Sequence, residues 1–529
     1  MTFVLLLLTK KRGNGKGENS MKLKVYHLSK TQRVKIAFYL MLFAFAFFFL
    51  LLFSFCTSPL FSTYNGADSA FFCLVGKGMT KGYLPYRDFF DTKGPYFFLI
   101  EYLGQLLSYG RRGIFLVQWI NLSLVILLIC NLCEQFGIHS IPHQLLLLIS
   151  CAWVASAAFE EGNLTEEFSL VPLCLCLNLS VRYFRKSFGS KKSHSVYYGA
   201  VYGACFAFLS LVRITNAALI CAIVFTICID LIINRNWRDL LYNAASFVAG
   251  FAAVFIPMLL FYASQGQAIE MLYAVFVFGF KYSAENNFVQ HLQMILSSPG
   301  YFFLVVLPAV LAVCTPQKDW RLRLLSVSGS IATFIAIASG NLYLHYFTLA
   351  IPLLVISELL IWDTIQSVKN VKPDARIKNC IVLLLSFFLL LFSLQAYYNP
   401  VNYTLRKAKS LIQSPDYTTG QNIRDIVEHI TESERDRVFC YNLNPDWYIY
   451  ADLFPYIKYC GWHNHYIILD PRIELELEQI FKTTPPKWVV LPENIGWLPS
   501  FLSAELKTRY VCSYSNEAFW LYKLADAAV

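Results

Sequence analysis

Residues 36–57 read IAFYLMLFAFAFFFLLLFSFCT, a predominantly apolar stretch that contains no charged side chain. A transmembrane helix needs about 20 such residues, so this stretch alone is long enough to cross a membrane. Across all 529 residues, 57% are hydrophobic and only 15% are charged, whereas the charged share of an ordinary soluble domain is about 25%. The composition therefore predicts a polytopic α-helical membrane protein.

Ten further apolar runs have the length and composition of membrane-spanning helices. With the first stretch they predict about eleven spans, the additional ones at 113–133, 143–159, 167–184, 196–212, 215–233, 243–262, 300–314, 324–340, 346–362 and 378–397.

The net charge of +10 is distributed as the positive-inside rule expects, in short clusters of Lys and Arg between the apolar runs. This pattern indicates a lipid bilayer and not nucleic acid as the partner. It places the N-terminus in the cytoplasm, and an odd number of spans then places the C-terminus outside. The predicted cytoplasmic loops carry Arg182, Arg185, Lys186, Lys191 and Lys192; Arg235 and Arg238; Lys318, Arg321 and Arg323; and Lys369, Lys372, Arg376 and Lys378.

The chain is predicted to have three parts, located in and on both sides of a plasma or inner membrane. Residues 1–35 form a basic cytoplasmic N-terminus, with Met1 and Met21 as candidate starts and no signal peptide. Residues 36–397 form the transmembrane domain, with a large first external loop at 58–112. Residues 398–529 form an extracytoplasmic soluble α/β domain, with a helix at 422–431, strands at 437–441 and 487–491, and a hairpin of 510–513 with 519–522.

The first external loop breaks the charge rule. It contains one apolar run, 96–107, which is short and interrupted by Glu101, and is typical of an interfacial or re-entrant helix. Many cations in an external loop indicate a function for that positive charge. The cations of this loop are Lys77, Lys81, Arg87, Lys93, Arg111 and Arg112.

Ionisable and polar side chains gather in the predicted external loops, and such groups near a membrane mark functional sites. The first loop, residues 64–95, reads YNGADSAFFCLVGKGMTKGYLPYRDFFDTKGP, and the second, 159–168, reads FEEGNLTEEF. A third contains Arg213 in LVRITNA, and a later one contains Asn341, His345 and Tyr346 in GNLYLHYF.

In this order and placement, the motifs resemble those of the GT-C membrane glycosyltransferases. They are most similar to the bacterial branch of the protein mannosyltransferases (glycosyltransferase family 39) and to the lipid A aminoarabinose transferases. The resemblance covers about residues 36–397. It implies transfer of a sugar from a polyprenyl-phosphate donor to a cell-envelope protein, glycan or lipid on the extracytoplasmic face.

The resemblance also implies roles for individual residues. Asp68 corresponds to the family's first-loop acidic residue, the candidate general base for the acceptor hydroxyl. Lys93 and Arg213, with Arg87, are the candidates for binding the donor phosphate. The candidates for acceptor or sugar binding are Asp91, Glu166, Glu167, His345 and Tyr346, and Glu166 with Glu167 could alternatively bind a divalent ion; no other cofactor is indicated.

The sequence leaves other functions open. Ser69 follows Asp68 where protein mannosyltransferases have a second acidic residue, so neither mannose nor a protein acceptor is specified. A transporter or flippase of lipid-linked saccharides is the alternative, although such proteins tend to show internal repeats, and none is visible here. A non-catalytic envelope-assembly scaffold is the third possibility.

Overall fold

The computed structural model describes residues 4–10, 21–27, 29–187, 193–284, 289–290, 293, 299–314, 319–339, 343–367 and 375–525. Asn341 and the predicted cytoplasmic cations Lys191, Lys192, Lys318, Lys369 and Lys372 lie outside these residues. The described chain divides into two compact units, Met1–Phe49 and Leu50–Val529.

The first unit contains a small hairpin and most of the first long helix. Strand β1 (Val4–Lys10) pairs antiparallel with β2 (Met21–His27). Helix α1 (Lys30–Phe53) covers residues 36–53 of the apolar stretch predicted as the first span, and residues 54–57 lie beyond its end. The hairpin was not predicted, because a basic, glycine-rich segment separates its two short strands in the sequence.

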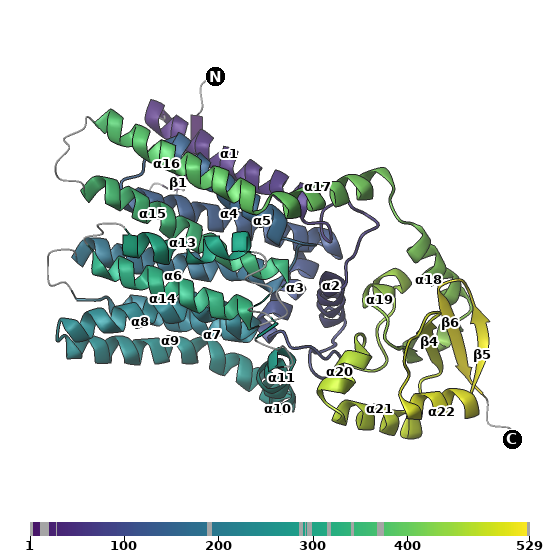
Figure 1. The fold of residues 1–529 in the computed structure, drawn as a ribbon. Coiled ribbons are helices and arrows are strands. Elements are labelled where there is room, and N and C mark those ends of the chain that lie inside the picture. Colours follow the sequence, from purple (N-terminus) through teal and green to yellow (C-terminus); the bar gives the residue numbers. More distant parts are fainter. Residues whose placement is uncertain are drawn as a thin grey trace, which may run out of the picture. The chain divides into compact units, whose positions relative to one another are not determined.

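The second unit contains a bundle of apolar helices (Figure 1). Each remaining predicted span is largely helical; the helices are α4 (Arg111–Gln135), α5 (Ile141–Ala158), α6 (Thr165–Ser187), α7 (Val196–Arg213), α8 (Ala218–Ile233), α9 (Trp237–Ser264), α13 (Pro299–Cys314), α14 (Trp320–Ala338), η3 (Leu344–Ala350) with α15 (Ile351–Ser367), and α16 (Ala375–Ala396).

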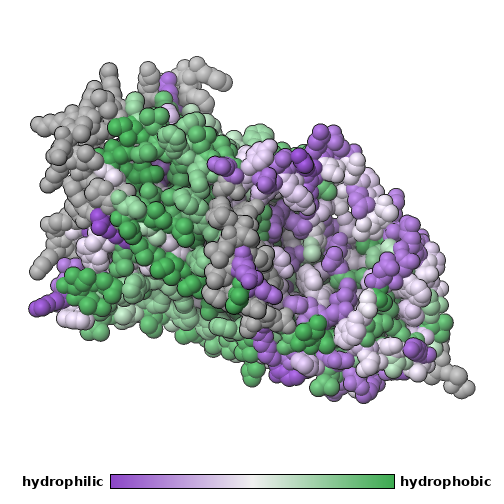
Figure 2. Space-filling model, in the orientation of Figure 1, coloured by the Kyte–Doolittle hydropathy of each residue, from purple (hydrophilic) through white to green (hydrophobic). Residues whose placement is uncertain are grey.

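Fewer than eleven of the described helices are long and apolar enough to cross a membrane. Over the described residues, eight helices are long and apolar enough to cross a membrane, or nine if one bent pair counts as a span. That count treats residues 196–233 as a single candidate span, although the chain is kinked at Leu211. The prediction of a polytopic helical protein is confirmed, and the figure of eleven stays a prediction. Figure 2 shows that the surface over these helices is largely hydrophobic, whereas that over the C-terminal domain is largely hydrophilic.

Residues 58–112 contain more structure than the sequence predicted. The helix expected at 96–107 is present as α3 (Pro95–Leu107), but a second helix, α2 (Asp68–Met79), was missed. Its twelve residues are mostly buried, and two glycines near its C-terminal end weaken the helical signal. Both helices lie at one end of the bundle, beside the C-terminal domain, and we call this the α2–α3 end (Figure 1).

The C-terminal domain is an α/β domain, as predicted. Its sheet has the order β3 (Val438–Cys440), β4 (Trp488–Pro492), β6 (Phe519–Leu524), β5 (Tyr510–Ser515). Strands β3 and β4 are parallel, and β5 and β6 form the expected hairpin. The surrounding helices are α17 (Tyr398–Gln413), α18 (Thr418–Glu428), α19 (Asp446–Ala451), α20 (His463–Leu469), α21 (Arg472–Thr483) and α22 (Ser500–Thr508).

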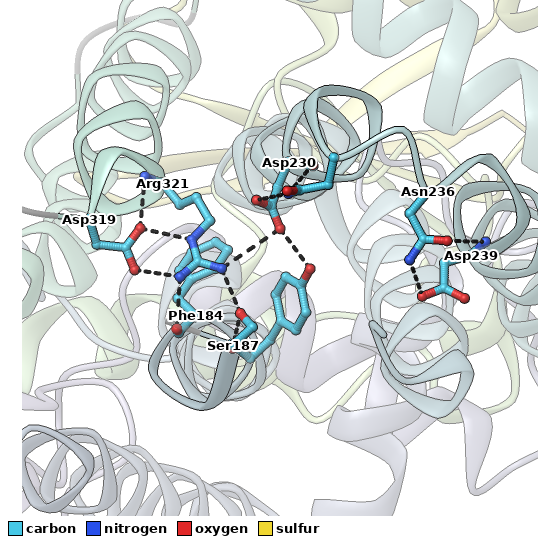
Figure 3. A network of polar contacts seen from close by, with 9 residues as sticks. Phe184, Ser187, Asp230, Asn236, Asp239, Asp319 and Arg321 are labelled. Atoms are coloured by element: carbon cyan, nitrogen blue, oxygen red, sulfur yellow. Dashed lines mark hydrogen bonds and ion pairs between the residues drawn. The ribbon is translucent and has the colours of Figure 1, made fainter. Parts of the chain in front are cut away.

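A buried ionic network joins helices α6, α8 and α14, where α6 and α8 end and α14 begins (Figure 3). Arg321, predicted as a cytoplasmic loop cation, is instead buried and pairs with Asp319 at 2.7 Å. Its guanidinium also donates to the Ser187 hydroxyl and the Phe184 carbonyl, and it lies 3.8 Å from Asp230. Because a buried charge is costly unless it is paired, this network fixes the relative positions of the three helices.

Candidate functional site

A cavity of about 690 Å³ opens at the α2–α3 end of the bundle. Its walls come from α2, the turn before α3, the loop before α6, the break after α7, the residues around η3, and helix α20 of the C-terminal domain. All but two of the predicted site residues line it, and so does Glu160; the lining set includes Asp68, Asp91, Lys93, Glu160, Glu166, Arg213, His345 and Tyr346.

The turn that carries Lys93 is attached directly to α7. The Gly94 N–H donates to the Val212 carbonyl at 2.9 Å. A Cβ at Gly94 would lie 2.1 Å from the Leu211 carbonyl oxygen, so only glycine permits this close approach. The contact holds Lys93 beside the segment that carries Arg213.

Lys93 is the first cation of the cavity. Its ammonium lies 3.6 Å from Asp91 and 5.6 Å from the centre of the Phe72 ring. Asp91 is buried, and its carboxylate also accepts the Lys93 backbone N–H at 2.8 Å. Burial lowers the pKa of Lys93, but the carboxylates of Asp91 and Asp68 outweigh it and the pKa is raised. Lys93 is therefore a permanent cation at physiological pH.

Arg213 is the second cation, and it lies where the chain leaves helical geometry. Leu211 breaks the regularity of α7, and Arg213 itself is extended before η1 (Ile214–Ala217). The guanidinium donates to Glu166 at 2.5 Å and stacks over the Tyr346 ring, 4.0 Å from its centre. Lys93 and Arg213 both line the same cavity.

Asp68 begins helix α2 and faces the same cavity. Its side chain is half-buried, and it forms no hydrogen bond or ion pair with any residue that the structure describes. Burial raises the pKa of this carboxyl, an effect that Lys93 and His345 oppose and Asp91 and Glu161 reinforce. A carboxylate that is unoccupied by protein donors and has a raised pKa can accept a proton from a bound molecule.

His345 closes the cavity from the η3 side. Its Nδ1 lies 2.5 Å from a Glu160 oxygen, and its Nε2 lies 4.0 Å from Glu166. Tyr343 stacks on the imidazole, and Tyr346 packs edge-on against it. His345 thus links Glu160 of the loop before α6 with Glu166 in the first turn of α6, and helps to orient Glu166 toward Arg213.

Two of the predicted site residues do not line the cavity. Arg87 is exposed and pairs with its neighbour Asp88 at 2.7 Å, while also donating to the Gly82 carbonyl. Glu167 is buried between α4 and α6, where it accepts a hydrogen bond from Gln118 at 2.9 Å. We therefore leave both residues out of the site.

The arrangement of the glutamates also gives no support for a divalent ion at Glu166 and Glu167. Their carboxylates pair with different partners, Arg213 and Gln118. Among the residues that the structure describes, no group of three or more His, Cys, Asp or Glu side chains is placed to hold a metal ion.

Several lining residues were not predicted. Tyr282 comes from α11 (Gly279–Ala284), and Trp462, His465 and Tyr466 come from the C-terminal domain. The sequence does carry a signal for the second group, because YCGWHNHY at 459–466 is unusually dense in aromatic and histidine side chains for a soluble domain. Aromatic side chains accompanied by a few polar groups commonly line ligand-binding sites.

Comparison with known proteins supports this description. Residues 96–438, well over half of the chain, match the family model described as "Predicted membrane protein (DUF2079)". The chain belongs to this family. The matched region of this DUF2079 protein contains Arg213, Glu166 and His345, but it begins after Asp68 and Lys93 and ends before α20. No curated protein matches the chain in sequence.

Solved structures with a similar fold include ArnT from Cupriavidus metallidurans in two states. The structure bound to undecaprenyl phosphate has a TM-score of 0.57 and 13% sequence identity, over 94% of this chain and 99% of that chain. The apo structure has a TM-score of 0.55 and 13% identity, over 93% and 98%. The resemblance to the aminoarabinose transferases is thus confirmed for the fold of the DUF2079 protein.

Proposed function

We propose that this protein transfers a sugar from a polyprenyl-phosphate donor to a hydroxyl of a cell-envelope acceptor on the extracytoplasmic face of the membrane. One observation carries the proposal: Lys93 and Arg213 line a single cavity together with the unoccupied carboxylate of Asp68. Such a cavity provides a cationic site for a phosphate leaving group and a base for an attacking hydroxyl.

The cationic side of the cavity suits a phosphate. Lys93 and Arg213 both line the cavity; like charges repel each other, and an anion between them relieves that repulsion. Arg213 can offer a planar fork to phosphate oxygens, and Lys93 a compact point charge. ArnT, which shares this fold, was solved with undecaprenyl phosphate, and that finding supports a polyprenyl phosphate as the anion.

The proposed reaction is a direct displacement at the anomeric carbon. Asp68 takes the proton of the acceptor hydroxyl as its oxygen bonds to that carbon, and the bond from carbon to the phosphate oxygen breaks. The products are the glycosylated acceptor and free polyprenyl phosphate, which carries one additional negative charge. Lys93 and Arg213 stabilise this charge as it develops, which is where preorganised cations contribute most to rate.

The cavity also offers an apolar route for the donor's hydrocarbon chain. Phe280 and Ile335 line it, and 71% and 60% of their respective surfaces are exposed. Phe276 and Val275 continue this apolar wall inward. A polyprenyl chain can follow these side chains out into the bilayer while its phosphate stays at Lys93.

Mass spectrometry of cells that lack the protein tests the proposal. We expect the lipid-phosphate sugar to accumulate and one glycan unit to be missing from the envelope, with Asp68→Asn giving the same result as deletion. Accumulation of the donor on the cytoplasmic face only would instead support a flippase. A normal glycan profile in the Asp68→Asn strain would support a non-catalytic scaffold.

A further inference from the structure

Helix α20 contributes an aromatic wall to the cavity from outside the bundle. Trp462, His465 and Tyr466 all line it, and all three fall within one short stretch of the C-terminal domain. Trp462 packs edge-on against Phe71 at 6.1 Å, which places it beside the helix that begins at Asp68. His465 packs edge-on against Tyr282 at 5.1 Å.

The backbone at this wall is held in an uncommon conformation. Trp462 has a φ of 51°, in the left-handed region where a bulky residue costs about 1 kcal/mol or more. His463 offsets that cost: its Nδ1 accepts the Asn442 N–H at 2.9 Å, and its Nε2 donates to the Tyr459 carbonyl at 2.7 Å. Burial lowers the pKa of His463 to about 4, so this neutral tautomer persists at physiological pH.

The other end of α20 is tied to the bundle side of the cavity. Asp470 pairs with Lys281 at 3.2 Å and also accepts a hydrogen bond from the Tyr273 hydroxyl. A few residues before α20, the Lys458 carbonyl accepts a hydrogen bond from the Phe90 N–H at 2.9 Å. These contacts from both sides hold the α20 side chains over the cavity.

We propose that Trp462, His465 and Tyr466 form the acceptor subsite, and that the group they bind is a saccharide presented from the aqueous side. This inference rests on the proposed transferase function. Pyranose rings carry C–H groups that pack on aromatic faces and hydroxyls that hydrogen-bond to imidazole and phenol groups. The wall belongs to the water-facing domain (Figure 2) and lies beside Asp68, where the attacking hydroxyl must be.

The subsite is distinct from the donor phosphate site in both position and chemistry. The phosphate is expected at Lys93 and Arg213, and the donor chain leaves past Ile335 on α14. The α20 wall contributes no Lys or Arg to the cavity, so its contacts suit neutral hydroxylated rings. Loss of the wall should therefore affect the acceptor and spare binding of the lipid phosphate.

Full-length variants in nanodiscs and in cells test this separation. Trp462→Ala should lower the amount of modified envelope acceptor by about 30-fold, as expected for loss of a central aromatic contact, with accumulation of the lipid-linked donor. Binding of undecaprenyl phosphate should stay within about threefold of wild type, which also reports a folded site. Trp462→Phe should retain part of the activity, and Trp520→Ala, at an exposed tryptophan of the same domain, should behave as wild type.

Each other outcome has a definite meaning. Normal acceptor modification by Trp462→Ala, or a loss of undecaprenyl phosphate binding as large as that of Lys93→Ala, would overturn the acceptor subsite. Failure of the transferase function looks different, because Asp68→Asn would then leave the envelope glycans unchanged.

Discussion

Replacing Lys93 by alanine should weaken binding of a polyprenyl phosphate by roughly one to two decades. The Lys93 ammonium provides a charge-assisted contact in a partly desolvated cavity, and such contacts contribute about 1.5–3 kcal/mol. A tenfold change in affinity corresponds to about 1.4 kcal/mol. The loss of affinity should fall in the upper half of that range, because the buried carboxylate of Asp91 lies 3.6 Å from the ammonium. Without the lysine, its carboxylate repels the phosphate.

The same geometry predicts the effects of three matched variants. Asp91→Asn removes the competing anion and should leave binding unchanged or tighter. Lys93→Arg should not restore binding fully, because a planar guanidinium does not fit a site built for a compact ammonium. Lys77→Ala should have no effect, since the Lys77 ammonium lies over the Tyr109 ring outside the cavity, 5.0 Å from its centre.

The assay is titration of purified protein in nanodiscs with undecaprenyl phosphate, at two salt concentrations. If both lysines are only exposed anchors, Lys77→Ala and Lys93→Ala should weaken binding by small and equal amounts, and salt should reduce both effects. That result would refute the phosphate site. A large loss in Lys93→Ala, with Lys77→Ala at the wild-type level, agrees with it.

Four further predictions follow from the structure. Asp68→Asn should lower transfer by about 10²–10⁴-fold. In the wild type, the transfer rate should fall as the pH is lowered, because only the charged form of Asp68 accepts a proton. The midpoint of that fall should lie above about 3.9, the ordinary aspartate pKa, because burial raises the pKa of Asp68. Gly94→Ala should displace the Lys93 turn and reduce undecaprenyl phosphate binding, whereas Gly496→Ala, which has open space around it, should not. Arg321→Ala removes the buried cation that pairs with Asp319 and neighbours Asp230, and it should destabilise the protein by about 3–5 kcal/mol, seen as a lower Tm in detergent with the phosphate affinity of the folded protein retained. Reporter fusions after Arg238 should report cytoplasm, and fusions near Gly162 and Asn422 the exterior; the same side for Arg238 and Asn422 would exclude the proposed topology.

Much of this fold could be predicted because a membrane imposes a simple pattern on the sequence. Long apolar runs such as 36–57 and 113–133 have few alternatives to a helix. Helix α2 lacked that signal, since Asp68–Met79 is short and contains two glycines. The strands of the C-terminal domain were found from their apolar runs, but their order required long-range pairing that local patterns do not contain.

The candidate site was only partly predictable, for three physical reasons. Adjacent residues on a helix point about 100° apart, so Glu166 and Glu167 could not both face the cavity, and the sequence did not say which one would. Arg87, two positions before the buried Phe89, forms an ion pair with its neighbour Asp88 instead of lining the cavity. The contribution of Trp462 depends on docking of the C-terminal domain, which no local motif specifies.

The most direct test of the central claim is transfer by the purified protein in nanodiscs. The substrates are a polyprenyl phosphate carrying an isotope-labelled sugar and envelope material from cells that lack the protein. We predict that labelled acceptor and free polyprenyl phosphate appear in equal amounts with the wild type, and that both fall by at least about 100-fold with Asp68→Asn. Movement of the intact labelled donor across the bilayer without release of polyprenyl phosphate would contradict the account.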